Sequence, residues 1–512
     1  MYLYIICVAA GLAVSSLAVL KNMHMFQLNS YAPMTHFRWL RKNFIKQWPQ
    51  ALILILTVLS GIIDSDILHI ILIASLLILL LFNKPIKNAK KPLVYTSRVK
   101  RMLATVLILY ALSIFFSFVF DLKYIIVGSL YVLTPVMPVI ANSINFPIEL
   151  SVRRWYINDA KKILKSCSNL IIIGITGSYG KTSVKYYLNT LLKAKYNVLM
   201  TPESFNTPMG ITKTIRESLK PTHEIFICEM GAKYKKEIKE LCDIVRPQHG
   251  IITSIGPQHL ETFKSIETII KTKFELADAV KNKGMLFLNG DNEIIMNNLH
   301  DQEYQTYGLN QTNQYYAYDV STTQKGTTFS VICKDNKLEN LNTQLIGYHN
   351  VLNLVGAIAL SLFLDVQHED IARQLKKLTS PPHRLQLLKN DGTIIIDDAY
   401  NSNPSGCKAA LDTLGLFDGY KILITPGMVE LGAQQDNLNY AFGEQAAAVC
   451  DYVILIGEKQ TKPIYNGLIN ANFDKSNILI ANQIKDGINQ AYAIKTEKQK
   501  ILLLENDLPD NY

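Results

Sequence analysis

The stretch GITGSYGKTSVK, Gly174 to Lys185, follows an apolar run at 169–173 and precedes a segment that is typical of a helix. A strand, a glycine-bearing turn and a helix in this order leave backbone N–H groups unpaired at the helix N-terminus, where phosphate binds. Lys181 would then reach the terminal phosphates of a nucleotide, and the Thr182 hydroxyl would bind Mg²⁺. The match to the general phosphate-binding loop is imperfect, because Ile175 stands where that pattern has a glycine. A Gly-Lys-Thr that begins a helix by chance is the alternative.

The residues after 166 alternate short apolar runs with helix-like segments. The runs expected to be buried strands are 170–175, 197–200, 224–228, 250–255 and 285–288. Strands that alternate with helices predict a parallel sheet with helices on both faces. Short alternating segments between Gln314 and Leu345 predict β-hairpins attached to this domain. A second α/β domain begins near Arg384, with strands expected at 393–396, 421–424, 452–456, 478–481 and 501–504.

The first third of the chain predicts an α-helical membrane domain. Its long apolar runs are 2–20, 51–63, 67–82, 102–120 and 124–140. The first, fourth and fifth runs approach the roughly 20 residues that a membrane-spanning helix needs. The second and third are shorter and predict a hairpin around an acidic turn at 64–66. A secretory signal peptide is the alternative for the first run, but that run has no basic n-region and further apolar segments follow it.

Positive charge sets the expected orientation of these five spans, because cytoplasmic loops are rich in Lys and Arg. The connection at 121–123 holds a single cation, Lys123, and the turn at 64–66 holds none. The cations gather between spans one and two, between spans three and four, and after span five: Lys21, Arg38, Arg41, Lys42 and Lys46; Lys84, Lys87, Lys90, Lys91, Arg98, Lys100 and Arg101; Arg153, Arg154, Lys161 and Lys162. The N-terminus is therefore expected outside the cell, and everything from about Asn145 onward is expected in the cytoplasm.

The composition limits the kinds of partner. The chain has 512 residues and a net charge of +10, much of it in the juxtamembrane Lys and Arg residues that would meet anionic lipid head groups. We therefore infer no nucleic acid partner. The seven cysteines contain no CxxC pair, which fits neither a zinc ribbon nor a disulfide framework. They are expected to be core thiols in a reducing compartment.

Beyond the loop, further sequence pieces occur in a recognisable order. The loop itself, TGSYGKT at 176–182, is similar to the ATP loop of the Mur ligase family, the amide ligases that build the peptide stem of bacterial cell walls. The other pieces are SFNTPMGI (204–211), EMGA (229–232), RPQHGIITSIGPQHLETF (246–263), KTKFELA (271–277), NGDN (289–292), GYHNVLNLVGAIAL (347–360), PPHR (381–384), IIDDAYNSNPSGCKAAL (395–411) and GMVELG (427–432). The chain most resembles the subgroup that adds D-alanyl-D-alanine.

This resemblance implies a domain plan and a reaction. A transmembrane domain at 1–144 and an amphipathic linker at 145–165 precede a central ATP-binding domain at 166–383 and a C-terminal, Rossmann-like α/β domain at 384–512. The implied activity is ATP-dependent ligation in peptidoglycan precursor synthesis, in which a carboxylate is activated as an acyl phosphate and coupled to an amine such as D-Ala-D-Ala. The implied location is the bacterial cell membrane, with the chain crossing several times and its catalytic domains in the cytoplasm.

The resemblance also implies the residues that hold two Mg²⁺ ions and stabilise phosphoryl transfer. Glu229 follows an expected strand and His259 lies in a loop after another, so both would join Thr182 as metal ligands. Taken alone, each would be an exposed carboxylate or a structural histidine. Lys273 aligns with a lysine that family members carry as a carbamate, which needs a neutral amine, so burial or nearby cations must lower its pKa. A solvated lysine beside Lys271 is the alternative.

Nucleotide and substrate contacts follow in the same way. The loop residues implied to bind ATP are Thr176, Gly177, Ser178, Gly180, Lys181, Thr182 and Ser183. Asn350 and Asn353, three apart on an expected helix, would face adenine. Arg384 and Asp398 resemble residues that reach ATP from the hinge and the C-terminal domain, so the two domains must close over the nucleotide. Residues expected at the substrates are Asn206 and Thr207 for the peptide, and Tyr400 and Asn401 for the amine; a turn is the alternative for Asn401.

The sequence departs from the family at its front, because membrane spans replace the usual domain that grips a UDP-sugar. The carboxylate donor is thus either a soluble UDP-linked peptide or a lipid-linked peptide presented in the bilayer, and the second is favoured here because an anchor raises the effective concentration of such a donor. A membrane-bound ligase of another polymer, similar to the poly-γ-glutamate synthases, and an inactive membrane scaffold are the alternatives. A related lipid-acting ligase with a four-cysteine zinc ribbon is disfavoured by the cysteine pattern.

Overall fold

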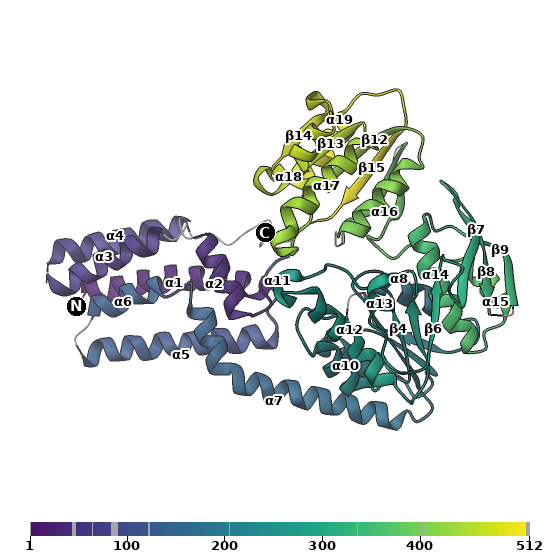
Figure 1. Cartoon of the computed structure of the whole chain (residues 1–512). Helices are drawn as coiled ribbons and strands as arrows, with labels where there is room; N and C mark the ends of the chain where they lie inside the picture. The colour runs from purple at the N-terminus through teal and green to yellow at the C-terminus, as the bar shows by residue number, and fades with distance from the viewer. Residues whose placement is uncertain are drawn as a thin grey trace. The chain divides into compact units, whose positions relative to one another are not determined.

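The computed structural model describes residues 2–43, 48–63, 65–82, 91–120, 123–203, 205–334, 336–390, 392–400 and 403–507 (Figure 1). These residues belong to two compact units, an N-terminal unit up to Arg154 and a larger unit from Trp155 to Asp507. Several residues named above lie outside the described ranges: Lys46, Asp64, Lys84, Lys87, Lys90, Ser204 and Asn401.

The N-terminal unit is helical throughout its regular elements. Its helices are α1 (Tyr2–Leu28), α2 (Pro33–Lys42), α3 (Trp48–Ile62), α4 (Asp66–Phe82), α5 (Ser97–Val119), α6 (Lys123–Val132) and the first half of α7 (Met137–Ser166). Within the described residues, α1 and α5 are long and apolar enough to cross a membrane. Helices α3 and α4 are apolar but shorter, although they pack together and against α1 and α6. Five spans were expected. By helix length and apolar composition, the described residues support two complete spans, or three if the bent pair of α6 and α7 counts as one.

The fifth expected span is not one straight helix. Helices α6 and α7 meet at an angle of 84° across residues 133–136. Pro135 lacks an N–H and disfavours helical backbone at the residue before it, and the Thr134 hydroxyl donates instead to the Tyr131 carbonyl at 2.8 Å. From Met137, α7 continues to Ser166, so the predicted linker at 145–165 is part of one helix.

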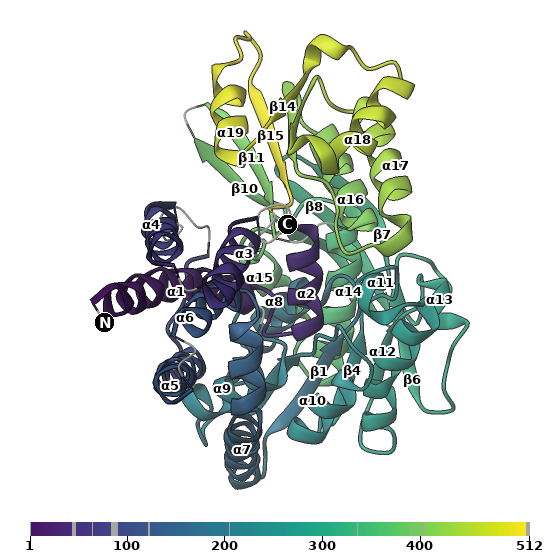
Figure 2. The same cartoon turned by 90° about the vertical axis from the view of Figure 1, so that its left-hand side faces the viewer.

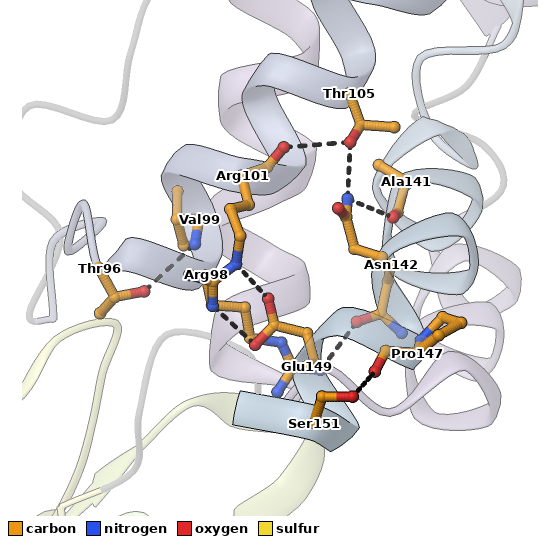
Figure 3. Close-up of polar contacts among 11 residues, drawn as sticks. Thr96, Arg98, Val99, Arg101, Thr105, Ala141, Asn142, Pro147, Glu149 and Ser151 are labelled. Atoms are coloured by element: carbon orange, nitrogen blue, oxygen red, sulfur yellow. Dashed lines mark hydrogen bonds and ion pairs between the residues drawn. The ribbon is translucent and has the colours of Figure 1, made fainter. Parts of the chain in front are cut away.

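A polar cluster joins the first turns of α5 to α7 (Figure 3). Arg101 forms a two-pronged ion pair with Glu149, with N···O distances of 2.7 and 2.9 Å. One turn earlier on α5, Arg98 donates to the side-chain oxygen of Asn142 at 2.8 Å, and its guanidinium lies 4.0 Å from the centre of the Tyr31 ring. These contacts fix the basic start of α5 against α7 within the N-terminal unit.

The middle domain is built on a nine-stranded sheet. The strand order is β2-β3-β1-β4-β5-β6-β7-β8-β9, parallel from β2 to β7 and antiparallel from β7 to β9. The strands are β1 (Ile171–Thr176), β2 (Val198–Met200), β3 (Ile225–Glu229), β4 (His249–Ile252), β5 (Leu286–Asn289), β6 (Tyr304–Gly308), β7 (Tyr315–Thr323), β8 (Gly326–Cys333) and β9 (Asn336–Thr343). The parallel sheet and the attached hairpins were predicted, and β6 was not.

Helices cover both faces of this sheet, as predicted (Figure 2). Alternate residues of β1 enter different cores: Ile173 packs with α8 and α14, and Ile172 packs with α10 and α12. The helices of this domain are α8 (Lys181–Leu192), α9 (Pro208–Ser218), α10 (Glu237–Val245), α11 (Leu260–Phe263), α12 (Ile266–Val280), α13 (Glu293–Met296), α14 (Tyr348–Phe363) and α15 (His368–Leu375). The carboxyl ends of β1, β3 and β4 therefore meet at one edge.

The C-terminal domain has a six-stranded sheet in the order β10-β11-β15-β12-β13-β14, parallel except for the edge strand β10. Its elements are β10 (Gln386–Asn390), β11 (Thr393–Asp398), α16 (Pro404–Gly415), β12 (Tyr420–Thr425), α17 (Gln435–Ala447), β13 (Tyr452–Ile456), α18 (Glu458–Asn470), β14 (Ile478–Ala481), α19 (Ile484–Ala493) and β15 (Lys500–Glu505). The five parallel strands were predicted. All seven cysteines are free thiols, and all except Cys167 are buried.

The loop between β1 and α8 depends on two glycines. Gly177 has φ 151° and Gly180 has φ 80°, both in the region that side chains disfavour. Gly180 precedes the first residue of α8, so its conformation turns the backbone into the helix. A Cβ atom added there would lie 2.6 Å from the side-chain oxygen of Asn353 on α14.

We expect Gly180→Ala to lower the thermal unfolding midpoint of the protein for two reasons. The left-handed backbone costs an alanine about 1–2 kcal/mol, and the new methyl group collides with Asn353. In an Asn353→Ala background the collision is absent, so the effect of Gly180→Ala should become smaller. Gly392→Ala, at φ 76° with nothing within 4 Å of the added Cβ, isolates the backbone cost. An equal loss at Gly180 in both backgrounds, measured by differential scanning calorimetry, would contradict the collision.

Candidate active site

The phosphate loop is anchored to the ends of the neighbouring strands. The Thr176 hydroxyl donates to the Met230 carbonyl and the Ser178 hydroxyl to the Gly256 carbonyl, both at 3.0 Å. The Lys181 ammonium donates to loop carbonyls, that of Gly177 at 2.7 Å and that of Ser178 at 3.0 Å. These contacts hold a strand-turn-helix geometry at the carboxyl end of β1, where a phosphate fits.

Lys181 is the common neighbour of the residues predicted to act in catalysis. It interacts electrostatically with Glu229, His259, Lys273 and Arg384. Burial is the main cause that lowers the pKa of Lys181 to about 8; Glu229 opposes this shift, and the nearby Arg384 guanidinium adds to it. The structure therefore brings these predicted residues together around one ammonium group, although they come from distant parts of the sequence.

Glu229 is a buried carboxylate and not the exposed one of the structural alternative. It is 1% exposed at the end of β3. Its Oε1 accepts hydrogen bonds from the Thr182 hydroxyl at 3.2 Å and from the Asn206 amide at 3.0 Å, and its Oε2 lies 2.9 Å from the Lys185 ammonium. Burial favours the neutral acid, but Lys185 and Lys181 together hold the pKa of Glu229 below its usual value.

Sequence reasoning missed Lys185, the last residue of the stretch GITGSYGKTSVK. A lysine on a helix is normally solvated, whereas the Lys185 side chain is fully buried. Its position one turn after Lys181 was the available signal, because residues four apart on a helix share a face. That face of α8 looks toward Glu229.

Lys273 lies on α12 and is 2% exposed, whereas its neighbour Lys271 is exposed. The solvated-lysine alternative is therefore wrong for Lys273. Burial and the positive charge of Lys181 hold the pKa of Lys273 well below its usual range. A neutral amine in that position meets the chemical requirement for carbamate formation.

His259 contacts a carboxylate from the C-terminal domain. Its Nδ1 forms a hydrogen bond with Glu430, and the Lys233 ammonium lies 3.1 Å from the other oxygen of the same carboxylate. Burial lowers the pKa of His259, and Glu430 opposes that shift. Metal-binding histidines commonly hold a carboxylate on the nitrogen that does not bind the metal, so this pair fits a metal role for Nε2. Sequence reasoning missed Glu430, although it lies in the quoted piece GMVELG.

The described residues contain no group of three or more His, Cys, Asp and Glu side chains placed to hold a metal ion. The donors present are the adjoining Thr182 hydroxyl and Glu229 carboxylate, both hard oxygen ligands of the kind that Mg²⁺ prefers. This partial set fits an ion that takes its other ligands from a nucleotide and water.

The two asparagines predicted to face adenine do not share a role in the structure. Asn350 is buried, its side-chain oxygen accepts from the Tyr187 hydroxyl at 2.7 Å, and its amide donates to the Ile346 carbonyl at 2.9 Å. The bond with Tyr187 fixes α14 against α8, and the bond with Ile346 is local to the start of α14, while Asn353 lies beside Gly180 of the phosphate loop. Burial raises the pKa of Tyr187, and Ser183, one turn earlier on α8, lowers it by a smaller amount.

Of the remaining predicted residues, some lie near the site around Lys181 and others make contacts within their own segment. The Arg384 guanidinium lies 4.4 Å from the centre of the Tyr400 ring. Asp398 accepts from the Leu385 N–H at 3.2 Å, and burial raises the pKa of Asp398 to about 6, against the pull of Arg384. Thr207 caps the N-terminus of α9 through its hydroxyl, which accepts from the Gly210 N–H at 3.3 Å. The substrate roles of Thr207 and Tyr400 stay predictions.

Comparison with protein families identifies both α/β domains. The chain matches the Mur ligase middle domain over residues 175–361 and the Mur ligase glutamate ligase domain over residues 383–505. Together these ranges cover more than half of the chain. They contain the phosphate loop from Ile175 and every residue described around Lys181.

Two curated relatives share this region. The "UDP-N-acetylmuramoyl-tripeptide--D-alanyl-D-alanine ligase" of Bacillus subtilis strain 168 is 35% identical over 281 residues, which are 54% of this chain and 60% of the relative. The protein of the same name from Escherichia coli K12 is 30% identical over 296 residues, which are 56% of this chain and 65% of the relative. The chain thus spans less than two thirds of the length of either relative.

Solved structures show the same fold. MurF from Acinetobacter baumannii superposes with a TM-score of 0.62 at 22% identity, covering 69% of this chain and 77% of that structure. The MurF ligase from Thermotoga maritima, crystallised with ADP, superposes with a TM-score of 0.59 at 24% identity, covering 69% of this chain and 80% of that structure. With its middle and C-terminal domains both matched, the chain belongs to the Mur ligase family.

Proposed function

We propose that this chain is an ATP-dependent ligase that couples a carboxylate to an amine in the synthesis of peptidoglycan precursors. The observation that carries the proposal is the arrangement around Lys181, where Glu229, Lys273 and Arg384 converge on the phosphate loop. Residues of both α/β domains contribute to it. A ligase that transfers a phosphoryl group needs cations such as Lys181 and Arg384 at this place, because negative charge spreads over the phosphoryl oxygens in the transition state.

The proposed chemistry has two steps. The donor carboxylate first attacks the γ-phosphorus of ATP, which gives an acyl phosphate and ADP. The amine then attacks the acyl carbon, an amide bond forms, and inorganic phosphate leaves while the nitrogen loses a proton. Lys181 and Arg384 stabilise the negative charge in the first step. Mg²⁺, when bound, would neutralise phosphate charge, and Thr182 and Glu229 are the residues that would hold it.

The two domains must act together, because Lys181 lies in the middle domain and Arg384 and Asp398 lie at the start of the C-terminal domain. An acyl phosphate is hydrolysed by water, so a site enclosed by both domains protects it. The carboxylate of Glu430 on His259 is a direct contact of this kind between the domains.

The relatives suggest the amine substrate, and the N-terminal unit suggests the carboxylate donor. Both curated relatives are named for D-alanyl-D-alanine, which supports that dipeptide as the amine. The family match begins at residue 175, after the apolar N-terminal unit. We therefore favour a lipid-linked peptide as carboxylate donor, because a bilayer anchor confines the site to the plane of such a substrate.

The decisive test is phosphate release by the full chain purified in detergent, with D-Ala-D-Ala and either a UDP-linked or an undecaprenyl-linked tripeptide. We expect release to require both donor and amine and the product mass to show a new amide. Lys181→Ala should lower the rate by about 100-fold or more, the cost of one missing charge-stabilising group. Lys213→Ala, on the exposed side of α9, is the matched control and should keep the wild-type rate.

Undiminished turnover by Lys181→Ala would contradict the ligase proposal. Equal or better use of the UDP-linked donor would contradict the lipid-linked donor alone. A product formed with glutamate as the amine would favour a ligase of another polymer, and a chain that releases no phosphate with any substrate pair would be a scaffold.

We also propose that Lys273 works as a carbamate, which converts a buried ammonium into an anion able to bind a second Mg²⁺. Its burial on α12 beside Lys181 supports this role. Native mass spectrometry of the intact chain should find one added CO₂ that is absent in Lys273→Gln, and turnover should fall in bicarbonate-depleted buffer and recover when bicarbonate returns. Lys273→Glu should keep more activity than Lys273→Gln, because only the former supplies a carboxylate, and Lys271→Gln is the exposed control. Turnover that does not depend on bicarbonate, together with an intact chain of unmodified mass, would rule the carbamate out.

We further propose that the N-terminal unit lies in the cell membrane and crosses it several times. Helices α1 and α5 have the length and apolar composition for this role, and the bent pair of α6 and α7 adds a third candidate. Side chains exposed on the unit include large apolar ones such as Ile55, Leu107 and Phe115, which water would disfavour. The basic cluster at the start of α5 marks the expected cytoplasmic boundary (Figure 3).

Thiol labelling of intact cells tests this location and its orientation. In a Cys167→Ser background, which removes the one cysteine that is not buried, we expect a membrane-impermeant maleimide to label Ser65→Cys from outside. Lys91→Cys should react only after the cells are opened, since it lies in the basic connection expected in the cytoplasm. Labelling of Lys91→Cys in intact cells, with Ser65→Cys protected, would show that the topology is the opposite of the one proposed. Release of the full chain from membranes by carbonate would contradict the membrane location itself.

A further inference from the structure

Two lysines approach Glu229 from one face of α8, and the proposed chemistry uses only Lys181. The second, Lys185, has a fully buried side chain with its ammonium 2.9 Å from Glu229 Oε2. The same ammonium donates a hydrogen bond to the backbone carbonyl of Glu203. Lys185 therefore connects a side chain at the end of β3 with the main chain of the connection between β2 and α9.

That connection also reaches Glu229 directly. Asn206 donates to Glu229 Oε1 at 3.0 Å, and its backbone carbonyl accepts from the Gly231 N–H at 2.9 Å. Glu203 itself has a left-handed backbone, with φ 39°. Both carboxylate oxygens of Glu229 are thus held by groups tied to this connection, Oε1 by Asn206 and Oε2 by Lys185.

The third group on Glu229 belongs to the nucleotide side. The Thr182 hydroxyl shares Oε1 with Asn206. The Glu229 carboxylate therefore contacts both the Thr182 hydroxyl, which is expected to bind the metal, and the connection that is expected to face the donor peptide. The Glu229 carboxylate and Lys185 thus both link the two sides.

A buried ion pair is a poor device for stability alone, because apolar side chains of similar size often stabilise a core equally well. The ion pair fixes the position of the Lys185 ammonium instead. That ammonium is held by the Glu229 carboxylate and the Glu203 carbonyl, so it cannot move without losing one of these partners. Lys185 fixes the carboxylate that would hold Mg²⁺ and fixes, with the same group, the connection that carries Asn206.

We propose that Lys185 is a positioning residue that couples the donor-binding connection at Glu203 and Asn206 to the Mg²⁺-nucleotide site at Glu229 and Thr182. This inference rests on the proposed ligase function and deepens it. Its consequence is that Mg²⁺ affinity and donor affinity depend on a side chain that touches neither ligand.

The test measures binding instead of turnover. The full chain in detergent is titrated with Mg²⁺ in the presence of a fluorescent, non-hydrolysable ATP analogue, with and without the donor peptide. We expect Lys185→Met to raise the half-saturating Mg²⁺ concentration by about 10-fold, as is typical when the group that orients a metal ligand is removed. It should also abolish the increase in Mg²⁺ affinity that the donor causes in the wild type. Lys193→Met, at an exposed lysine at the C-terminal end of α8, should change neither quantity.

Lys185→Met leaves a buried carboxylate without its partner and is at risk of misfolding, so a second variant is needed. Lys185→Arg keeps the charge, but its fork cannot hold the carboxylate and the Glu203 carbonyl in the same geometry. We expect it to fold with a wild-type melting curve and to show a smaller shift in Mg²⁺ affinity. Combined with Asn206→Ala, its effect should be less than additive, because both changes release the same connection.

The outcomes separate this inference from the proposed function. Folded Lys185 variants with wild-type Mg²⁺ titrations and wild-type donor coupling would overturn the inference even if the ligase is active. A loss of stability alone, without a shift in either affinity, would make Lys185 purely structural and would also overturn it. A wild-type chain that binds no Mg²⁺-nucleotide would overturn both proposals.

Discussion

A buried negative charge at the end of β3 governs the arrangement of the middle domain. Glu229 is almost completely removed from water, so its charge must be balanced by neighbouring groups. Two lysines of α8, a hydroxyl of the same helix and an amide from the next connection perform that task. The register of β3 beside β1 places Glu229 opposite Ile175, and Gly180 of the loop leads directly into α8, so these elements bring the balancing groups to the carboxylate.

Elements with strong local signals could be predicted from the sequence. The buried parallel strands are continuous apolar runs, and the strand-turn-helix of the phosphate loop carries its own glycines and cations. The edge strand β10 was missed because its residues are largely exposed and show no apolar run. The bend between α6 and α7 has a local cause in Pro135, but hydropathy alone merged the two helices into one span.

The site residues that were not predicted from the sequence have no local signal of their function. Lys185 and Glu430 acquire their roles from long-range contacts, with Glu229 and with His259, and a lysine or glutamate in isolation is typical of a solvated surface. Asn350 shows the opposite case. Its position on a helix led to the prediction of an adenine contact, whereas in the structure it is buried and hydrogen-bonded to Tyr187. The electrostatic neighbours of a residue cannot be assigned without the fold. The sequence could therefore indicate which residues belong to the site, but not which side chains they contact there.

The contact between His259 and Glu430 has a consequence for the reaction cycle. The carboxylate that orients the histidine sits on the C-terminal domain, and Lys233 of the middle domain holds the same carboxylate. In the proposed reaction cycle, separation of the domains to release products would remove from the imidazole the partner that fixes its tautomer. If His259 binds the cation as proposed, its affinity for the ion would fall at each product release and rise again at each closure. The ion would then be bound most tightly only while both domains enclose the reactants.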